Sequence, residues 1–241
     1  MYNQLAPFKL KAGVRDEKKP NTESYRCEWC GSNQLMVKYH DEEWGVPAHN
    51  DDTFFEFLIL EGAQAGLTWQ TVLNKRENYR KAFRGFDAKI IAHYGAKDIK
   101  RLLADAGIIR NRLKVAATIQ NAKKFLEIQK EFGSFDAYIW QFVGGKQMNN
   151  KIKSMKDIPV TTKESDAMSK DLLKRGFKFV GSTICYAFMQ AVGMVNDHEI
   201  RCFRYALHRS HSRLCRGYAR VSGRSASRTS ANCQLGQRRL H

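Results

Sequence analysis

The stretch that decides the fold runs from Lys38 to Asn74 and reads KYHDEEWGVPAHNDDTFFEFLILEGAQAGLTWQTVLN. Its centre, residues 54–60, is apolar at every position except Glu56 and has the spacing of a helix. A single carboxylate, Glu61, follows that run, and burying a carboxylate without a partner is costly. Small residues and then Trp69 come next, so an acid, a gap and an aromatic ring are close in sequence. This combination predicts a pocket for a planar polar ligand.

A simpler interpretation of Glu61 and Trp69 stays open at this point. A glutamate at the end of an apolar helix is most often solvated, and a tryptophan is most often part of the core. The pattern alone therefore does not separate a ligand pocket from an ordinary helix end.

Helical patterns continue on both sides of this stretch, and no segment of useful length alternates with a period of two. Acidic residues and Thr53 favour the start of a helix over about 52–63, and a second helix is expected over about 69–83. Further helical segments are expected near 87–91, 99–106, 110–132, 135–142, 162–175 and 179–194, with a loop over 146–161. The sequence therefore predicts an all-α fold, without an internal repeat.

Composition indicates a basic protein with a substantial core. The chain has 241 residues, 43% of them hydrophobic, which suffices for one large domain. Lys and Arg total 41 against 24 Asp and Glu, and the net charge of +17 suits a polyanionic partner, nucleic acid first. No apolar run approaches the ~20 residues of a membrane span, and the start of the chain lacks the apolar segment of a signal peptide. We therefore expect an intracellular, cytoplasmic protein that does not associate with membranes.

Two changes in composition divide the chain. Residues 1–24 are polar and Lys-rich, and we expect a flexible extension there. From Phe203 onward the chain has nine arginines and no aspartate, glutamate or lysine; removing these nine charges from +17 leaves +8 for residues 1–202. The argument for a nucleic-acid partner therefore does not depend on this end. We expect residues 25–203 to form the folded domain, and 204–241 to be a disordered tail, either a nucleic-acid-binding arm or a grafted end.

The cysteines indicate a metal site rather than a disulfide scaffold. Six cysteines in a chain of this length are too few for a disulfide scaffold. Cys27 and His40 near one end, and His198 and Cys202 near the other, supply two thiolates and two imidazoles, a set that suits tetrahedral zinc. Four protein ligands leave no open position, so such a zinc would be structural. Spacing alone leaves open that the two pairs are unrelated core residues.

The segment LLADAGIIRNRLKVAA, residues 102–117, has the pattern of two helices joined by a tight turn. A glycine turn, here at Gly107, exposes backbone N–H groups that can bind a phosphate at a helix N-terminus. Arg110, Arg112 and Lys114 would add sequence-independent affinity for DNA. An ordinary corner between two helices, with a solvated basic face, describes the pattern equally well.

Several motifs resemble one family, the 3-methyladenine DNA glycosylases of type I: YHDEEWGVP, LEGAQAGLTWQTVL, KRENYR, DAGIIRNR, SDAMSKDLLKRGFKFVG, TICYAFMQA and VNDH. They run in order from about Arg26 to Cys202, most of the chain. The resemblance implies an all-α, helix-hairpin-helix DNA glycosylase fold in which a structural zinc joins the N- and C-terminal parts. It implies four zinc ligands, Cys27, His40, His198 and Cys202, and leaves Cys30 outside the set.

The resemblance also implies an activity: hydrolysis of the N-glycosidic bond of 3-methyladenine in alkylated double-stranded DNA, which releases the base and leaves an abasic site. The base has to be flipped out of the duplex to be reached. Tyr39 and Trp69 would flank the cationic base, and Glu61 would recognise its edge first and act in catalysis second. The family commonly has a tyrosine where this chain has Met36, whose polarizable sulfur can also contact a base. Leu67 would either fill the gap left in the base stack or belong to the core.

Two rival functions remain to be compared with this one. A DNA-binding module with weak catalysis, which Met36 makes conceivable, would bind lesions without releasing the base. A zinc hydrolase or deaminase is disfavoured, because the chain lacks the H-x-E and P-C-x-x-C pattern and a fully liganded zinc cannot activate water.

We expect a monomer that is associated with the nucleoid when it acts on DNA.

Overall fold

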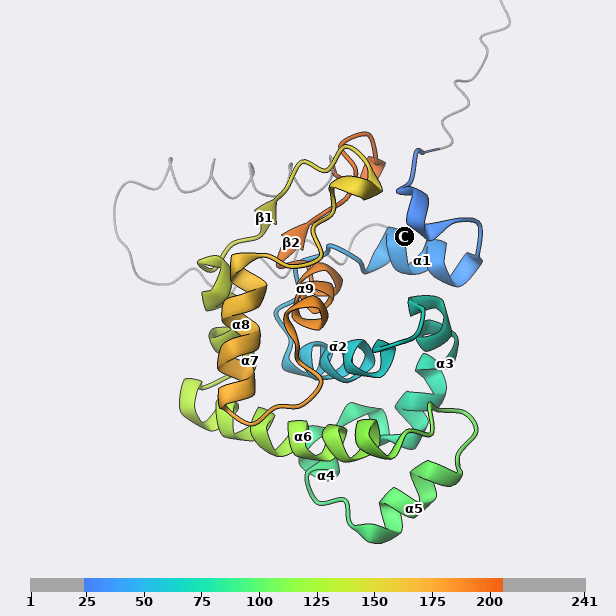
Figure 1. The fold of residues 1–241 in the computed structure, drawn as a ribbon, viewed down its shortest axis with the longest axis vertical. Helices are drawn as coiled ribbons and strands as arrows, with labels where there is room; N and C mark the ends of the chain where they lie inside the picture. The colour runs from blue at the N-terminus through green and yellow to red at the C-terminus, as the bar shows by residue number, and fades with distance from the viewer. Residues whose placement is uncertain (1–23, 206–241) are drawn as a thin grey trace, which may run out of the picture.

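Helix α2 (Asp51–Gln64) lies at the centre of the fold, as the apolar run at its middle predicts (Figure 1). The computed structural model describes residues 24–205. Asn50 begins the helix, since its side-chain oxygen accepts a hydrogen bond from the backbone N–H of Thr53 at 3.0 Å. Every residue from Phe57 to Ala63 is buried, so the second half of α2 has no solvent-facing side.

The other helices surround α2. They are α1 (Gln34–Glu42), α3 (Trp69–Ala82), α4 (Ala88–Ile91), α5 (Ala96–Ala104), α6 (Arg112–Phe132), α7 (Phe135–Ile139), α8 (Lys163–Lys174) and α9 (Ser182–Ala191). Short 3-10 helices connect them at Glu28–Cys30, Arg84–Phe86, Trp140–Val143 and Met155–Asp157. Helices α3, α6, α7 and α9 all contact α2, and the long α6 runs along its lower side in Figure 1.

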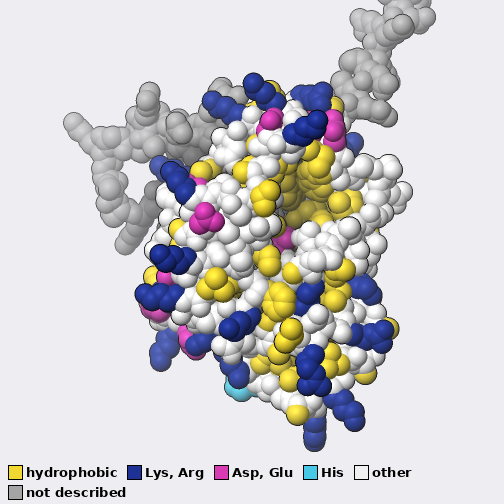
Figure 2. All heavy atoms as spheres, viewed as in Figure 1, with side chains coloured by type: hydrophobic (Ala, Val, Ile, Leu, Met, Phe, Trp, Pro, Cys, Tyr) yellow, Lys and Arg dark blue, Asp and Glu magenta, His cyan; other side chains and the backbone are white. Residues whose placement is uncertain are grey.

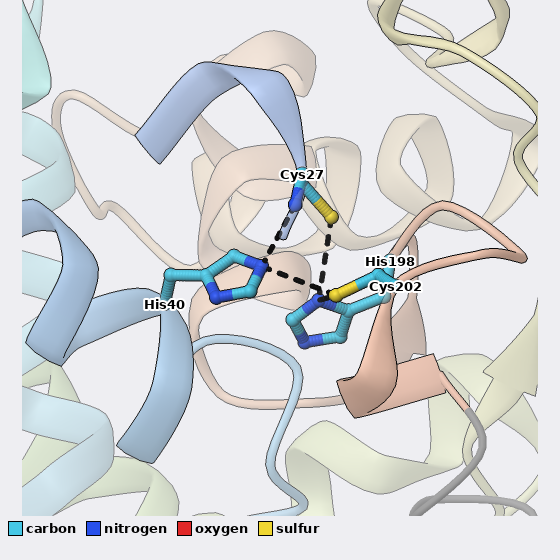
Figure 3. A group of neighbouring side chains, drawn as sticks. All are labelled: Cys27, His40, His198 and Cys202. Carbon is cyan, nitrogen blue, oxygen red and sulfur yellow. Dashed lines mark hydrogen bonds between the residues drawn. The ribbon is translucent and has the colours of Figure 1, made fainter. Parts of the chain in front are cut away.

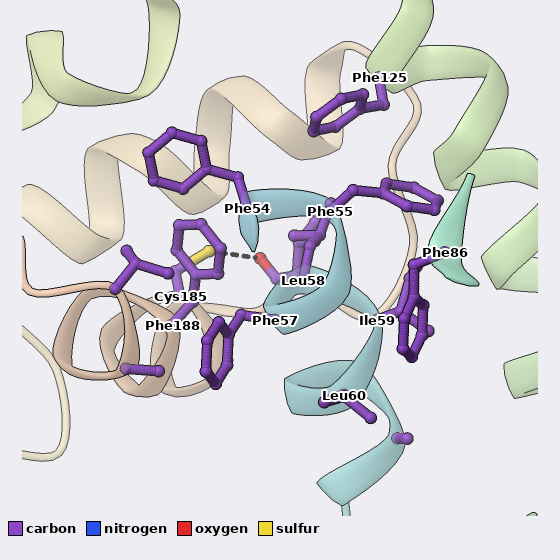
Figure 4. Packing of buried hydrophobic residues seen from close by; sticks show 14 of the residues in the cluster. Phe54, Phe55, Phe57, Leu58, Ile59, Leu60, Phe86, Phe125, Cys185 and Phe188 are labelled. Atoms are coloured by element: carbon purple, nitrogen blue, oxygen red, sulfur yellow. Dashed lines mark hydrogen bonds between the residues drawn. The ribbon is translucent and has the colours of Figure 1, made fainter. Parts of the chain in front are cut away.

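Phenylalanine rings from several of these helices form the core around α2 (Figure 4). The ring of Phe55 lies 5.0 Å from that of Phe125 on α6, and Phe125 in turn lies 4.3 Å from Phe135 on α7. On another side of α2, Phe54 lies 6.3 Å from Phe188 on α9. Each such side chain contributes about 1.5–3 kcal/mol on burial. This packing fixes the orientation of α2 and therefore the direction in which its remaining side chains point.

The structure confirms a mostly helical fold, with one correction. The helices predicted over 52–63 and 69–83 are α2 and α3, and the long segment at 110–132 is α6. Two short strands interrupt the all-α prediction: β1 (Met148–Asn149) pairs in parallel with β2 (Val195–Asn196). Each strand has two residues, too few to produce a visible alternation, and β1 lies within the segment expected to be a loop.

The two ends of the described chain lie together (Figure 1). The backbone N–H of Phe203 donates to the carbonyl of Tyr25 at 3.1 Å, and the Tyr25 hydroxyl donates to Glu199 Oε2 at 2.8 Å. Residues 1–23 of the predicted extension and 206–241 of the predicted tail lie outside the described residues. Within residues 24–205, no helix has both the length and the apolar composition needed to cross a membrane.

Candidate functional site

Glu61 lies near the C-terminal end of α2 and is a buried acid, with only 4% of its surface exposed. Its carboxylate makes no hydrogen bond or ion pair with any residue between 24 and 205. Because burial penalises the charged form, the pKa of the Glu61 carboxyl is raised to about 8. A solvated helix end is therefore excluded. An acid buried without a protein counter-charge marks a candidate binding site.

Two aromatic side chains stand beside this acid. Tyr39 comes from α1 and Trp69 is the first residue of α3, and their ring centroids lie 5.1 Å apart at 44°. The pKa of the Tyr39 hydroxyl is raised by burial and next by the charge of Glu61, which places the two groups close together. The indole N–H of Trp69 is buried and has no partner within the described residues. The structure thus brings together the three residues that the sequence predicts for the pocket.

The other two predicted pocket residues lie at different depths. Met36 is half-buried on α1, one helical turn before Tyr39, and packs against the core. Leu67 lies between α2 and α3, follows Gly66 with its positive φ of 76°, and is 41% exposed. Leu67 is therefore not a core residue. Its apolar side chain projects from the turn between α2 and α3, and the gap-filling role stays a prediction.

The surface is hollowed on the face beside α1 (Figure 2). Apolar side chains line the hollow, an acidic side chain lies at its lower margin, and lysines and arginines are scattered over the surrounding surface. A separate cavity between α2, α3 and α6 is lined by residues that include Lys114 but no acid. This cavity therefore has a lysine and no counter-charge for a cationic ligand.

A second cluster joins the ends of the domain (Figure 3). The donor atoms of Cys27, His40, His198 and Cys202 all lie within 4.8 Å of one another, and all four residues are buried. Cys27 Sγ lies 3.5 Å from His198 Nδ1, and Cys202 Sγ lies 3.4 Å from His40 Nε2. Spacing alone left open whether the pair near the start of the domain is related to the pair near its end. In the structure the two pairs form one group. The thiol of Cys30 lies outside it and contacts the carbonyl of Gly31.

Hydrogen bonds fix both imidazole rings of this cluster. His40 Nδ1 lies 2.7 Å from Asp41 Oδ1, and Arg26 holds the same carboxylate at 2.8–2.9 Å. His198 Nε2 lies 2.9 Å from the carbonyl of Trp44. With these outer nitrogens donating, the inner nitrogens direct their lone pairs toward the sulfurs, as in protein metal sites. The residues present therefore fit a tetrahedral metal ion with two sulfur and two nitrogen ligands.

The two thiols of the cluster differ electrostatically. The hydrogen bond from Cys27, followed by contacts with the two histidines, holds the pKa of the Cys202 thiol well below its usual value. The same hydrogen bond together with burial raises the pKa of Cys27. The protein thus stabilises a thiolate here, which is the form that binds metals.

The α5–α6 turn (residues 105–111) places its cations in two different ways. Arg110 and Arg112 are exposed, and their side chains form no hydrogen bond or ion pair with the rest of residues 24–205. Lys114 instead directs its amine at α2, where Nζ lies 2.8 Å from the Ala63 carbonyl. The N–H of Gly107 donates to Asp105 Oδ1 at 2.7 Å. The sequence pattern predicted a free amine at Lys114 and a free backbone N–H at Gly107. In the structure both groups already donate hydrogen bonds within the protein.

Gly107 has a packing role in this turn. A Cβ on Gly107 would lie 2.9 Å from Asp105 Oδ1 and 3.0 Å from the Cβ of Asn78 on α3. The turn therefore approaches α3 too closely for any larger residue. This contact accounts for the glycine without a bound phosphate.

Sequence reasoning missed two parts of the site. Helix α1, which carries Tyr39 and His40, was not predicted; the available signal was Asn33, whose side chain caps the backbone N–H groups of the first turn. Arg76 was also missed. It is buried, lies 2.8 Å from Glu43 and 5.0 Å from the Phe57 ring, and so ties α3 to the end of α1 and to α2.

Comparison with known proteins identifies the family to which the chain belongs. Residues 29–205 match the family model described as methyladenine glycosylase. The chain belongs to the methyladenine glycosylase family. The resemblance predicted from the sequence motifs is thereby confirmed.

Named relatives of this methyladenine glycosylase cover most of the described domain. The chain is 48% identical over 180 residues to DNA-3-methyladenine glycosylase 1 of Escherichia coli. This match covers 75% of this chain and 96% of the relative. It is 46% identical over 177 residues to the DNA-3-methyladenine glycosylase of Haemophilus influenzae, over 73% and 96% of the two chains.

Solved structures agree with this assignment. A crystal structure of a 3-methyladenine DNA glycosylase I superposes with a TM-score of 0.73 at 50% identity, over 74% of this chain and 98% of the other. A 3-methyladenine DNA glycosylase I variant in complex with 3-methyladenine gives 0.72 at 32% identity, over 74% and 96%. The match therefore covers nearly all of each solved chain.

Proposed function

We propose that this methyladenine glycosylase is a base-excision repair enzyme that hydrolyses the N-glycosidic bond of 3-methyladenine in alkylated double-stranded DNA. It releases the free base and leaves an abasic site. The observation that carries the proposal is Glu61, a buried acid without a counter-charge beside Tyr39 and Trp69. The names of the relatives, DNA-3-methyladenine glycosylases, give the substrate that fits this pocket.

The pocket selects the lesion by its charge. Alkylation at N3 makes adenine cationic and a good leaving group, and a flipped cationic base would supply the charge that Glu61 lacks. Tyr39 and Trp69 would offer their negative ring faces to the same cation. Neutral adenine gives no such compensation, so it is bound less well. In this proposal Glu61 binds the base first and, in its second role, orients the attacking water.

Two solved relatives carry substitutions at the residue types that matter here. One is a tyrosine-to-phenylalanine variant in complex with 3-methyladenine, and another is a glutamate-to-glutamine variant of the enzyme from Staphylococcus aureus. A tyrosine and a glutamate are the polar residues that this chain places together as Tyr39 and Glu61. Met36 would form the third wall of the pocket, with its sulfur against the base.

The cluster of Cys27, His40, His198 and Cys202 is proposed to hold one structural zinc per chain. Burial, the two-sulfur, two-nitrogen donor set and the fixed imidazole rings support this assignment. When bound, the ion would stabilise the fold by joining its two ends and would supply no chemistry to the reaction.

The α5–α6 pair is proposed to act as the helix-hairpin-helix that binds the DNA backbone. Arg110 and Arg112 are exposed and free to reach phosphates, which gives affinity that does not depend on sequence. Leu67 would enter the duplex where the flipped base has left the stack. The protein would do so as a monomer, associated with the nucleoid.

The decisive experiment is base release from methylated DNA, followed by chromatography of the freed bases. We expect free 3-methyladenine from the wild-type protein, and much less from Glu61→Gln. The rival function, a binding module with weak catalysis, predicts tight binding to alkylated DNA with no free base. Lesion binding without release by a folded, metal-loaded protein would contradict the proposed activity.

A further inference from the structure

Lys114, in the first turn of α6, directs its amine at the end of another helix. Its Nζ donates to the carbonyls of Ala63 at 2.8 Å and Ala65 at 2.7 Å. These carbonyls belong to the last turn and the C-cap of α2, where backbone acceptors lack helical partners. A cation at this position is also favoured by the helix dipole. Lys114 therefore caps α2 from α6.

The capped carbonyls lie directly before the turn that leads into the pocket. Ala65 is followed by Gly66, whose φ is 76°, and by the exposed Leu67, whose N–H donates to the Gln64 carbonyl at 2.6 Å. Helix α3 then begins at Trp69. One side chain of α6 thus holds the segment that presents Leu67 and ends at the aromatic wall of the pocket.

A second set of contacts ties the α5–α6 turn to α3. Lys75 Nζ donates to the carbonyls of Ala106 at 3.0 Å and Gly107 at 3.4 Å. The backbone N–H of Ile109 donates to the Tyr79 hydroxyl at 3.3 Å. Together with Lys114, these bonds connect the α5–α6 turn with α3 and with the α2–α3 turn.

Building on the proposed function, we propose that Lys114 is a positioning residue that couples the grip of the α5–α6 turn on the DNA backbone to the placement of Leu67. When the exposed Arg110 and Arg112 bind phosphates, α6 takes a fixed position on the duplex. The hydrogen bonds of Lys114 then set where the α2–α3 turn meets the base stack. Lys114 acts through Leu67 and does not itself contact phosphate, because its amine is already engaged by two carbonyls.

The test compares Lys114→Met with Lys123→Met. Lys123 is an exposed residue of the same helix whose side chain forms no hydrogen bond or ion pair within residues 24–205, so its variant controls for the lost charge. We expect single-turnover release of 3-methyladenine from duplex DNA to fall on the order of tenfold or more for Lys114→Met, and to stay unchanged for Lys123→Met. Free 3-methyladenine should bind both variants as it binds wild type, by tryptophan fluorescence. The salt dependence of binding to undamaged duplex should also be the same for both.

A double-mutant cycle with Leu67→Ala separates positioning from simple stabilisation. If Lys114 acts through Leu67, Lys114→Met should cost little further activity when Leu67 is already alanine. Lys114→Arg, which keeps the charge and donors, should restore part of the rate and serves if the methionine variant does not fold. An equal loss in both backgrounds, or a salt slope reduced by about one phosphate contact, would overturn the inference.

These outcomes are distinct from a failure of the proposed function. If the wild-type protein releases no base from methylated DNA, the activity itself is wrong. If the wild type is active and Lys114→Met is equally active, only the role of Lys114 is wrong.

Discussion

Glu61→Gln is expected to lower activity and raise stability, two effects that an ordinary surface residue would not produce together. Glu61 is buried and has no protein partner within residues 24–205, and burial raises the pKa of its carboxyl from 4.5 to about 8. Ionising this carboxyl inside the fold therefore costs free energy. Glutamine keeps the shape and one acceptor oxygen but carries no charge, so it avoids that cost.

The pKa shift gives the sign and the pH range of the stability effect. Below pH 4.5 the carboxyl is protonated in both the folded and the unfolded state and adds no cost. Between pH 4.5 and about 8 the folded state binds the proton more tightly, so the free energy of unfolding falls as pH rises. At about 1.4 kcal/mol per pH unit, the loss at neutral pH is roughly 3 kcal/mol, and it reaches its full size above the folded-state pKa.

Two measurements check this reasoning. Urea unfolding of the wild type and Glu61→Gln, at about pH 5, 7 and 9, should show a stability gain in the variant that grows with pH. Single-turnover release of 3-methyladenine should fall about ten- to a hundredfold, because a charged hydrogen bond in a desolvated site is worth roughly 1.5–3 kcal/mol. Binding to undamaged duplex should survive, since Arg110 and Arg112 lie on a separate turn.

Either measurement can refute the argument. Wild-type release rates in a folded Glu61→Gln protein would remove Glu61 from the pocket. A stability difference that stays constant with pH would show that solvent or another group already compensates the carboxylate, and the electrostatic account of lesion selection would fail.

Three further predictions concern the aromatic wall, the metal and the DNA backbone. Trp69→Ala should lose binding to free 3-methyladenine while keeping duplex affinity, by fluorescence and gel-shift titration. Cys202→Ser should lose zinc in metal analysis and unfold at lower temperature, whereas Cys30→Ser should keep both; the reverse pattern would reassign the ligands. Arg110→Ala should weaken binding alike to damaged and undamaged duplex and reduce the salt slope by about one; a loss confined to damaged duplex would contradict a phosphate contact.

The sequence predicted the centre of the fold because the physics there is local. The spacing of the apolar residues before Glu61 predicts a helix. The capping residues and the length of the apolar pattern place the ends of α2 within a residue or two. Helix α1 was missed because its nine-residue sequence is short and mostly polar, and only Tyr39 and His40 of it are fully buried. The strand pair was missed because its pairing is set by contacts between distant segments rather than by a repeat.

The sequence predicted which residues form the site more fully than it predicted how they are arranged in space. The metal cluster rested on resemblance, because spacing cannot bring Cys27 next to His198, 171 residues away. Lys114 shows a different limit: its residue type is given by the sequence, but the direction of its side chain is not. Its charge beside a glycine turn suggested a phosphate ligand, but the direction of a flexible amine depends on which carbonyls the fold leaves unpaired nearby. The sequence contains no local signal for that choice.

The position of the cysteine and histidine cluster has a consequence for biosynthesis. Two of its members lie near the start of the domain and two near its end, and the last, Cys202, emerges from the ribosome after almost all of the folded part. A chain that stops short of Cys202 cannot complete the cluster, however well its earlier helices form. Metal loading, where it occurs, would therefore report that translation has passed the end of the domain, and prematurely terminated chains would remain unligated and open to proteolysis.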